Sequence, residues 1–280
     1  MKRKLSFVLA LALLLTLVVT QVTTYAAAPE NAVIRCSTTT SVNDTGLLPY
    51  LQSDFEAETG YELIVVSNGS GAAIKLGESG DADVLLVHSK AAEEEFVANG
   101  YGVSRISFMY NYFVIIGPAA DPAGIADCEN AAEAFAAIAS SKSLFVSRGD
   151  ESGTHTAEKK IWAAAEVKPD EQDEWYISAG AGMGASLIQA NEREAYILSD
   201  KATFLSMKDN LDLEILLERG EDMKNVYSLI ECDPEKTSGL NSEGAQAFIA
   251  YMTSEATAEK IAGFGVEQYG QPLFYVDMDE

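Results

Sequence analysis

The sequence of 280 residues has few histidines and cysteines, and each shortage argues against a class of site. Two histidines in the whole chain argue against a metal centre built from several imidazole ligands. The three cysteines, Cys36, Cys128 and Cys232, lack the close spacing of metal-binding motifs. In an oxidising compartment they allow one disulfide and one free thiol, but the sequence does not define the pair. We therefore expect no bound metal ion and no cofactor.

Basic residues are also scarce, because 19 Lys and Arg stand against 43 Asp and Glu and give a formal net charge of −24. A field of this sign repels nucleic acid and anionic lipid, so neither is expected as a partner. A small anion is not excluded, since local dipoles and one buried cation can outweigh a screened surface field.

The first 28 residues have the layout of a secretory signal peptide. A basic start (MKRK) precedes the apolar run LSFVLALALLLTLVVTQV, and three alanines follow at 26–28. The run is about long enough to span a bilayer, and Pro29 follows the best cleavage motif, so an uncleaved anchor is an alternative. No lipobox-like L-x-x-C closes the segment. The sequence predicts export to the periplasm or the cell surface.

After residue 28, short apolar runs alternate with helical patterns, which is typical of parallel sheets covered by helices. The runs FMYNYFVIIGP (108–118) and NVYSLIE (225–231) are predicted to cross between two lobes. We expect an α/β sandwich in which residues 29–116 and 225–280 form lobe I and residues 117–224 form lobe II. The other predicted strands are residues 32–36, 61–66, 84–87, 144–147, 174–178 and 195–199.

Three polar turns each follow a predicted strand and precede a predicted helix: STTTS (37–41), SNGSG (67–71) and SRGDESGT (147–154). The carboxyl ends of parallel strands surround the usual ligand crevice of an α/β sheet. Helix amino termini there offer free amides and a positive dipole end, which suit an anion. Any one such turn is most simply an N-cap, but three together indicate a site. The glycine-rich GAGMGAS (180–186) is a fourth candidate turn.

Arg148 is the only basic residue in these turns. Its guanidinium could contact an oxyanion through two donors, or it could form a structural pair with Asp150. Both interpretations hold if Asp150 orients the guanidinium and leaves donors facing the ligand.

An enzymatic interpretation rests on Ser152 and His155, which could serve as nucleophile and base of a secreted hydrolase. The surrounding DESGT lacks the G-x-S-x-G elbow of such enzymes. The turn SNGSGAAIK also lacks the G-K-[ST] ending of a nucleotide-binding loop. We expect a binding protein and keep the hydrolase as a remote alternative.

The ordered motifs resemble the tungstate-binding subfamily of ABC-transporter extracellular solute-binding proteins. They are TTTSVNDTGLLPYL, SNGSGAAIKLGESGDADVLLVHSK, FMYNYFVIIGP, SRGDESGTHTAEKKIW and AYILSDKATFL, of which GDADVLLVH and SRGDxSGTH are the most specific. The resemblance implies a type II periplasmic-binding-protein fold, a monomer whose lobes close on an oxyanion destined for a membrane permease. The ligand positions that it implies are Thr39, Thr40, Ser41, Ser70, Arg148, Ser152, Gly153 and Thr154.

The choice of oxyanion depends on two acids near these turns. Tungstate and molybdate carry no proton near neutral pH, so their site should present donors only, whereas phosphate can be selected by a carboxylate acceptor. Tungstate or molybdate is favoured if Asp150 pairs with Arg148 and Asp44 caps the following helix. Phosphate is favoured if either acid faces the cleft unpaired, and a phosphate or sulfate receptor is therefore the alternative. The sequence does not rank tungstate against molybdate.

Overall fold

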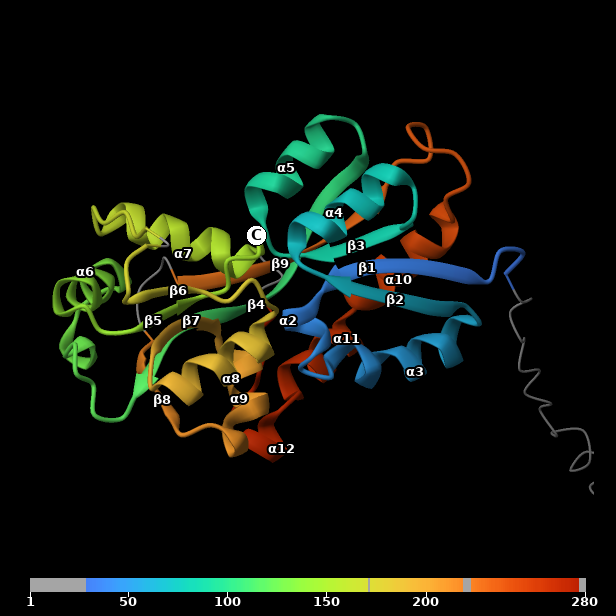
Figure 1. The fold of residues 1–280 in the computed structure, drawn as a ribbon. Coiled ribbons are helices and arrows are strands. Elements are labelled where there is room, and N and C mark those ends of the chain that lie inside the picture. Colours follow the sequence, from blue (N-terminus) through green and yellow to red (C-terminus); the bar gives the residue numbers. More distant parts are fainter. Residues whose placement is uncertain (1–28, 171, 219–222, 277–280) are drawn as a thin grey trace, which may run out of the picture.

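The computed structural model describes residues 29–170, 172–218 and 223–276, which form two lobes side by side (Figure 1). The predicted signal peptide, residues 1–28, lies outside this part. No helix in the described ranges is long and apolar enough to cross a membrane. The strands within them follow the order β2-β1-β3-β9-β4-β7-β5-β6, and β8 pairs with β4 beside this path.

In lobe I, β1 (Val33–Thr39) lies between β2 (Glu62–Asn68) and β3 (Val84–Val87) and runs parallel to both. Alternate residues of β3 enter two separate apolar clusters, because successive side chains of a strand point to opposite faces. Helices therefore cover both faces. They are α3 (Leu47–Thr59), α10 (Ser242–Met252) and α11 (Glu255–Gly263) on one face, and α4 (Ser70–Ser79) and α5 (Lys90–Ala98) on the other. The short helices α2 (Thr40–Asn43) and α12 (Val266–Tyr269) complete the lobe.

Lobe II repeats this layering. Its β5 (Phe145–Ser147) lies between β6 (Tyr176–Ser178) and β7 (Tyr196–Asp200) and runs parallel to both. One apolar cluster packs under α6 (Ala131–Ser141) and α7 (Gly153–Ala164). The other packs under α8 (Met183–Arg193) and α9 (Lys201–Met207), and β8 (Leu213–Leu217) and two short 3-10 turns, Ile125–Asp127 and Lys208–Asn210, complete the lobe.

Two strands join the lobes. The first part of β4 (Gly102–Pro118) pairs with β9 (Lys224–Cys232), and from Phe113 onward β4 pairs instead with β7 and β8. The change of partners after Tyr112 marks the crossing between the lobes, next to the Asn111–Asn225 pair, whose side chains are joined by a 2.8 Å hydrogen bond. The lobe boundaries at residues 116 and 224 stay a prediction.

The predicted strands are confirmed in order, with ends shifted by a few residues, and the lobes are mixed rather than parallel sheets because β4 and β9 are antiparallel to their neighbours. Sequence patterns missed α2, α9, β8 and the start of β4. These are short or polar segments without an apolar period of their own. No disulfide joins Cys36, Cys128 or Cys232, all of which are described. Burial raises the pKa of the Cys36 and Cys232 thiols to about 12.

Candidate functional site

The four turns converge where the two lobes touch. A Cβ built on Gly69 of lobe I would lie 3.8 Å from the Cβ of Ser152 in lobe II. One built on Gly153 would lie 3.2 Å from Ser70 Oγ, and one built on Gly182 would lie 3.9 Å from Thr40 Oγ1. The lobes are therefore closed on this point.

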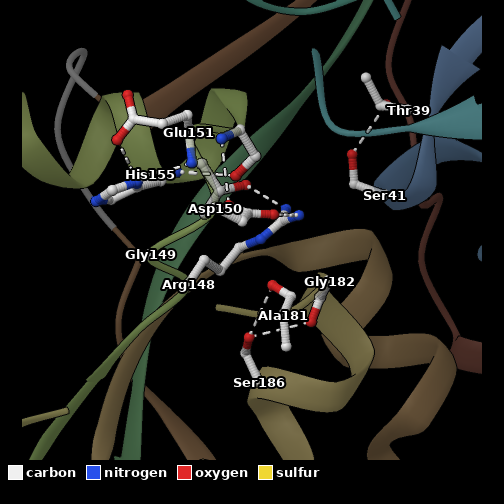
Figure 2. Close-up of polar contacts among 12 residues, drawn as sticks. Thr39, Ser41, Arg148, Gly149, Asp150, Glu151, His155, Ala181, Gly182 and Ser186 are labelled. Carbon is white, nitrogen blue, oxygen red and sulfur yellow. Dashed lines mark hydrogen bonds and ion pairs between the residues drawn. The ribbon is translucent and has the colours of Figure 1, made fainter. Parts of the chain in front are cut away.

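The first turn supplies three hydroxyls at the end of β1. Thr39 Oγ1 lies 3.1 Å from Ser41 Oγ (Figure 2). Ser41 Oγ in turn lies 3.1 Å from His88 Nε2. Thr40 Oγ1 is buried and has no hydrogen-bond partner. In the second turn, Ser70 begins α4, and its Oγ is likewise buried without a partner.

Arg148 enters the site from the end of β5, and its side chain is only 2% exposed. Its Nη2 donates to Asp150 Oδ2 at 2.5 Å (Figure 2). Its Nη1 contacts Thr154 Oγ1 at a long 3.5 Å. Asp150 Oδ1 accepts a hydrogen bond from the Ser152 backbone N–H at 3.2 Å. Asp150 is thus occupied by the arginine and the turn, and Arg148 Nε has no partner.

The third turn holds its shape through one glycine and one cap. Gly149 has a φ of +61°, and a Cβ there would lie 2.0 Å from Ser178 Oγ, so a larger residue would displace the turn. Ser152 Oγ accepts from His155 N at 3.2 Å and caps α7. This cap uses an oxygen lone pair, so the Ser152 hydroxyl hydrogen remains available to a ligand.

Among the described residues, four buried side-chain polar atoms lack a hydrogen-bond partner, and three of them belong to these turns. They are Thr40 Oγ1, Ser70 Oγ and Arg148 Nε, and the fourth is Ser228 Oγ. Buried polar groups are nearly always satisfied, because an unmade hydrogen bond costs about 1–3 kcal/mol. Three unsatisfied donors at the meeting point of the turns indicate a site for an acceptor-rich ligand.

His88 supports the site from behind, a role that the sequence did not reveal. Its Nδ1 lies 2.8 Å from Asn225 Oδ1, and its ring stacks on Tyr227 at 4.8 Å. Asn225 Nδ2 donates to Asn111 Oδ1, which fixes Asn225 Oδ1 toward the ring. Burial lowers the pKa of His88 to about 4. The neutral ring therefore donates from Nδ1 and accepts the Ser41 hydroxyl at Nε2.

Asp200 is a second buried group near the site that sequence patterns missed. It begins α9 as the N-cap, and its side chain accepts from Thr203 N at 2.8 Å and from Thr203 Oγ1 at 2.7 Å. Burial raises the pKa of Asp200 above its ordinary value, although hydrogen bonds from Thr203 and the positive charge of Arg148 act in the opposite direction. Only its place after an apolar strand could have marked this residue, since a lone Asp before a helix is an ordinary cap.

Comparison with known proteins assigns the family. Residues 23–256 match the PBP superfamily domain. The chain is 45% identical over 240 residues to the tungstate-binding protein TupA of Peptoclostridium acidaminophilum, with 85% of this chain and 83% of that protein covered. The chain belongs to the PBP superfamily, in the family of these tungstate-binding proteins. The type II periplasmic-binding-protein fold is thereby confirmed.

Two solved structures of PBP-superfamily relatives share the whole architecture. The tungstate ABC transporter structure from Geobacter sulfurreducens is 42% identical, has a TM-score of 0.77, and covers 83% of this chain and 98% of its own. The tungstate-binding protein TupA from Desulfovibrio alaskensis G20 is 40% identical, has a TM-score of 0.73, and covers 88% and 98% respectively.

In this PBP-superfamily chain, the two acids behave differently. Asp150 pairs with Arg148, as the preference for tungstate or molybdate requires. Asp44 does not cap the following helix. It is the C-cap residue of α2, and Gly46, with a φ of 83°, precedes α3 without a side-chain cap. Burial raises the pKa of Asp44 above its ordinary value, although a hydrogen bond with Asn43 and the charge of Arg148 act in the opposite direction. The carboxylate of Asp44 therefore lies within the field of the arginine.

The hydrolase interpretation gains no support from the geometry around Ser152. The contact between Ser152 and His155 uses the backbone N–H of the histidine, not its ring. The ring accepts from Glu151 N at 3.1 Å through Nδ1 and lies 3.3 Å from Glu151 Oε1. The described residues also contain no cluster of three or more His, Cys, Asp or Glu that could hold a metal ion.

Proposed function

We propose that this protein is the extracellular solute-binding component of an ABC importer, which captures tungstate or molybdate between its lobes and delivers it to the permease. The proposal includes export, with either release or retention by the amino-terminal segment, and it assigns no catalytic role to the chain. Relatives of this chain that are named as tungstate-binding proteins support the choice of cargo.

The observation that carries the proposal is the set of unsatisfied donors, Thr40 Oγ1, Ser70 Oγ and Arg148 Nε. Each can donate to an oxygen of a tetrahedral dianion, and a fully charged oxyanion makes such hydrogen bonds about twice as strong as neutral ones. A ligand with several acceptor oxygens and no hydrogen to donate would satisfy all three.

Further donors come from both lobes, and we assign the ligand set on that basis. Ser152 and Thr154 keep hydroxyl hydrogens for the ligand, and Gly153 N–H lies in the first turn of α7, at the positive end of its dipole. Thr39 and Ser41 must rotate their hydroxyls away from each other and His88 to donate. The full set is Thr39, Thr40, Ser41, Ser70, Arg148, Ser152, Gly153 and Thr154.

Selectivity against phosphate follows from the same donors. Both carboxylate oxygens of Asp150 accept hydrogen bonds, one from Arg148 and one from the Ser152 backbone N–H. Asp150 therefore offers no acceptor to a protonated oxyanion. Asp44 and Asp200 also lie in the field of Arg148, and Asp200 accepts hydrogen bonds from Thr203. A phosphate receptor would need an acceptor for the proton of its ligand, and Asp150 does not provide one.

The proposal is tested by titrating the protein with tungstate, molybdate, sulfate and phosphate. Trp162 reports on the site, because its Nε1 donates to Glu158, which also accepts from Ser147 Oγ, the residue before Arg148. Tungstate and molybdate should change its fluorescence and raise the melting temperature at micromolar concentration. Stronger stabilisation by phosphate would refute the choice of cargo, and no response to any of the four would refute the receptor itself.

A further inference from the structure

Helix α9 of lobe II also packs against lobe I, beside the candidate site. Its Ala202 belongs to an apolar cluster of lobe I, whereas its Phe204 belongs to one of lobe II. Thr203, which lies between them, is completely buried. Its Oγ1 donates to the backbone carbonyl oxygen of Ser41 at 3.2 Å. One hydroxyl of lobe II therefore contacts the first of the turns that form the candidate site in lobe I.

The Thr203 hydroxyl has more acceptors around it than it can serve. Besides Ser41 O, its Oγ1 lies 2.9 Å from Asp200 Oδ1 and 2.7 Å from Asp200 Oδ2. A threonine hydroxyl carries one hydrogen, so it serves either the acid of its own lobe or the carbonyl of the other lobe. An ionised Asp200 takes this hydrogen, because the charge-assisted bond is the stronger one. A protonated Asp200 instead donates to Thr203 Oγ1, and the Thr203 hydrogen is then free for Ser41 O.

The surroundings of Asp200 favour a proton on its carboxyl group. Burial raises the pKa of Asp200 above its ordinary value, although hydrogen bonds within its helix cap and the positive charge of Arg148 act in the opposite direction. Arg148 is bonded to Asp150 and also acts on Asp44, so one positive charge is shared among three acids. A dianion bound beside Arg148 would offset that charge and favour the proton on Asp200 further.

Three further titratable groups around Asp200 are neutral or paired. Tyr227 faces it from β9, and burial together with the charge of Asp200 raises the pKa of the Tyr227 phenol, which stays protonated. The His88 ring stacks on Tyr227 and is neutral, since burial lowers its pKa to about 4. On α9 itself, Lys201 forms an ion pair with Glu218. Asp200 is therefore the group of this cluster whose charge changes with pH.

We propose that Thr203 is a positioning residue that holds the two lobes together in the closed form, by donating to Ser41 O while Asp200 carries a proton. We call this hydrogen bond the latch. The inference rests on the proposed function, because Thr40 and Ser41 belong to the proposed ligand set, and the latch keeps their turn next to the turn that carries Arg148. An arriving dianion favours the proton on Asp200, and the proton completes the latch. Closure is thereby coupled to the charge of the ligand, and the ligand leaves more slowly while the latch is formed.

The test measures the dissociation rate of tungstate by stopped-flow fluorescence between about pH 6 and pH 9 for wild type, Thr203→Val and Asp200→Asn. An acid with a raised pKa loses its proton as the pH rises, so wild-type dissociation should become faster with pH. Asp200→Asn keeps a donor beside Thr203 at every pH, so its rate should stay slow and constant. Thr203→Val lacks the hydroxyl, so its rate should be constant and about 5-fold above that of wild type at pH 6.

Proton uptake gives a second readout that a merely structural role of Thr203 would not change. Calorimetry near pH 7 in two buffers of different ionisation enthalpy should show that wild type takes up protons when tungstate binds. Asp200→Asn should take up none through this group. A wild-type dissociation rate that does not change with pH, or one that changes equally in Asp200→Asn, would overturn the control of the latch by Asp200.

Two further variants separate the hydroxyl from the packing of the side chain. Thr203→Ser keeps the hydroxyl and should dissociate within about 2-fold of wild type. Thr257→Val is the matched control, because Thr257 is likewise completely buried three residues after a helix N-cap, Ser254 of α11, but lies in lobe I. Its rate should equal that of wild type.

The latch is overturned if Thr203→Val dissociates at the wild-type rate, or if Thr203→Ser or Thr257→Val is accelerated as much as Thr203→Val. Wild-type protein that binds no tungstate at equilibrium would instead refute the proposed function. The melting temperature of each variant shows that it is folded.

Discussion

Arg35 in lobe I and Arg148 in lobe II are both bonded to a nearby aspartate, but only Arg35 has all its donor groups engaged. The Arg35 guanidinium donates to Asp83 through Nε and Nη2 and to Gly80 O through Nη1. Arg148 is more deeply buried, with 2% of its side chain exposed against 34% for Arg35. Even so, it makes one short contact to Asp150 and leaves Nε unsatisfied.

The difference indicates that Arg35 stabilises the fold, whereas Arg148 keeps a donor available for a ligand. Burial opposes ionisation of Asp83, but hydrogen bonds from Arg35 and from backbone amides outweigh it and lower the pKa of Asp83. That pair connects β1 to the chain before β3 and to Asn241 at the start of α10. Asp150, by contrast, only orients Arg148 within one turn.

The largest expected effect comes from removing the Arg148 side chain. Arg148→Ala should weaken tungstate binding by at least about 100-fold, because a buried charged donor is removed from a dianion. Its stability should change by less than about 1 kcal/mol, since the deleted side chain carries an unsatisfied atom of its own. Isothermal titration and chemical denaturation measure the two quantities.

Arg35→Ala provides the opposite pattern. It leaves the Asp83 carboxylate, 1% exposed, without its cation and should cost about 2 kcal/mol of stability, less than for a fully buried pair because Arg35 is partly exposed. Tungstate affinity should stay within about 2-fold of wild type. If Arg35→Ala lost binding and Arg148→Ala lost stability, the contrast between the two arginines would be wrong.

A smaller effect is expected from Gly153→Ala, which keeps Arg148 but obstructs lobe closure. The added Cβ would lie 2.9 Å from His88 Cε1, closer than such contacts allow, so the lobes must stay slightly apart. We expect about 10-fold weaker binding, with stability unchanged or slightly higher because alanine favours a helix. Small-angle scattering should show a less compact liganded form. Gly263→Ala is the control, since nothing lies within 4 Å of its Cβ, and equal loss there would exclude closure as the cause.

Much of the fold followed from local patterns, because buried strands and helices carry apolar periods that survive in any tertiary context. Val84–Val87 appears with its predicted bounds. The start of β4 did not, since GVSRIS is polar and becomes a strand only through its pairing with β9. Likewise, α2 could not be predicted, because its four residues carry no helical pattern of their own and the helix depends on tertiary contacts.

The candidate site could be predicted where a residue type and its place after a strand agreed, as for Arg148 and Ser70. His88 could not be assigned, because its role depends on Asn225, a residue 137 positions away that only the crossing strand brings near. The direction of Asp150 was equally undecidable, since an aspartate two residues from an arginine can turn either way. Contacts with the crossing strands, and the direction in which a side chain turns, cannot be predicted from periodicity and spacing.

A final test concerns Glu158, a buried acid of lobe II that has no arginine partner comparable to that of Asp83. Glu158 accepts from Ser147 Oγ, Trp162 Nε1 and Tyr176 Oη, with no cation bonded to it, and burial raises its pKa to about 7 from an ordinary 4.5. The folded protein therefore holds a proton that the unfolded chain releases between these values, and this group's stabilisation is lost as the pH rises from about 4.5 to 7. Glu158→Gln removes that dependence, so between pH 5 and pH 8 the variant should gain about 2 kcal/mol relative to wild type in chemical denaturation. If the stabilities of wild type and Glu158→Gln changed in parallel with pH, Glu158 would already be ionised in the folded protein. Its charge would then be compensated, as that of Asp83 is by Arg35, and the contrast between the two lobes would be wrong.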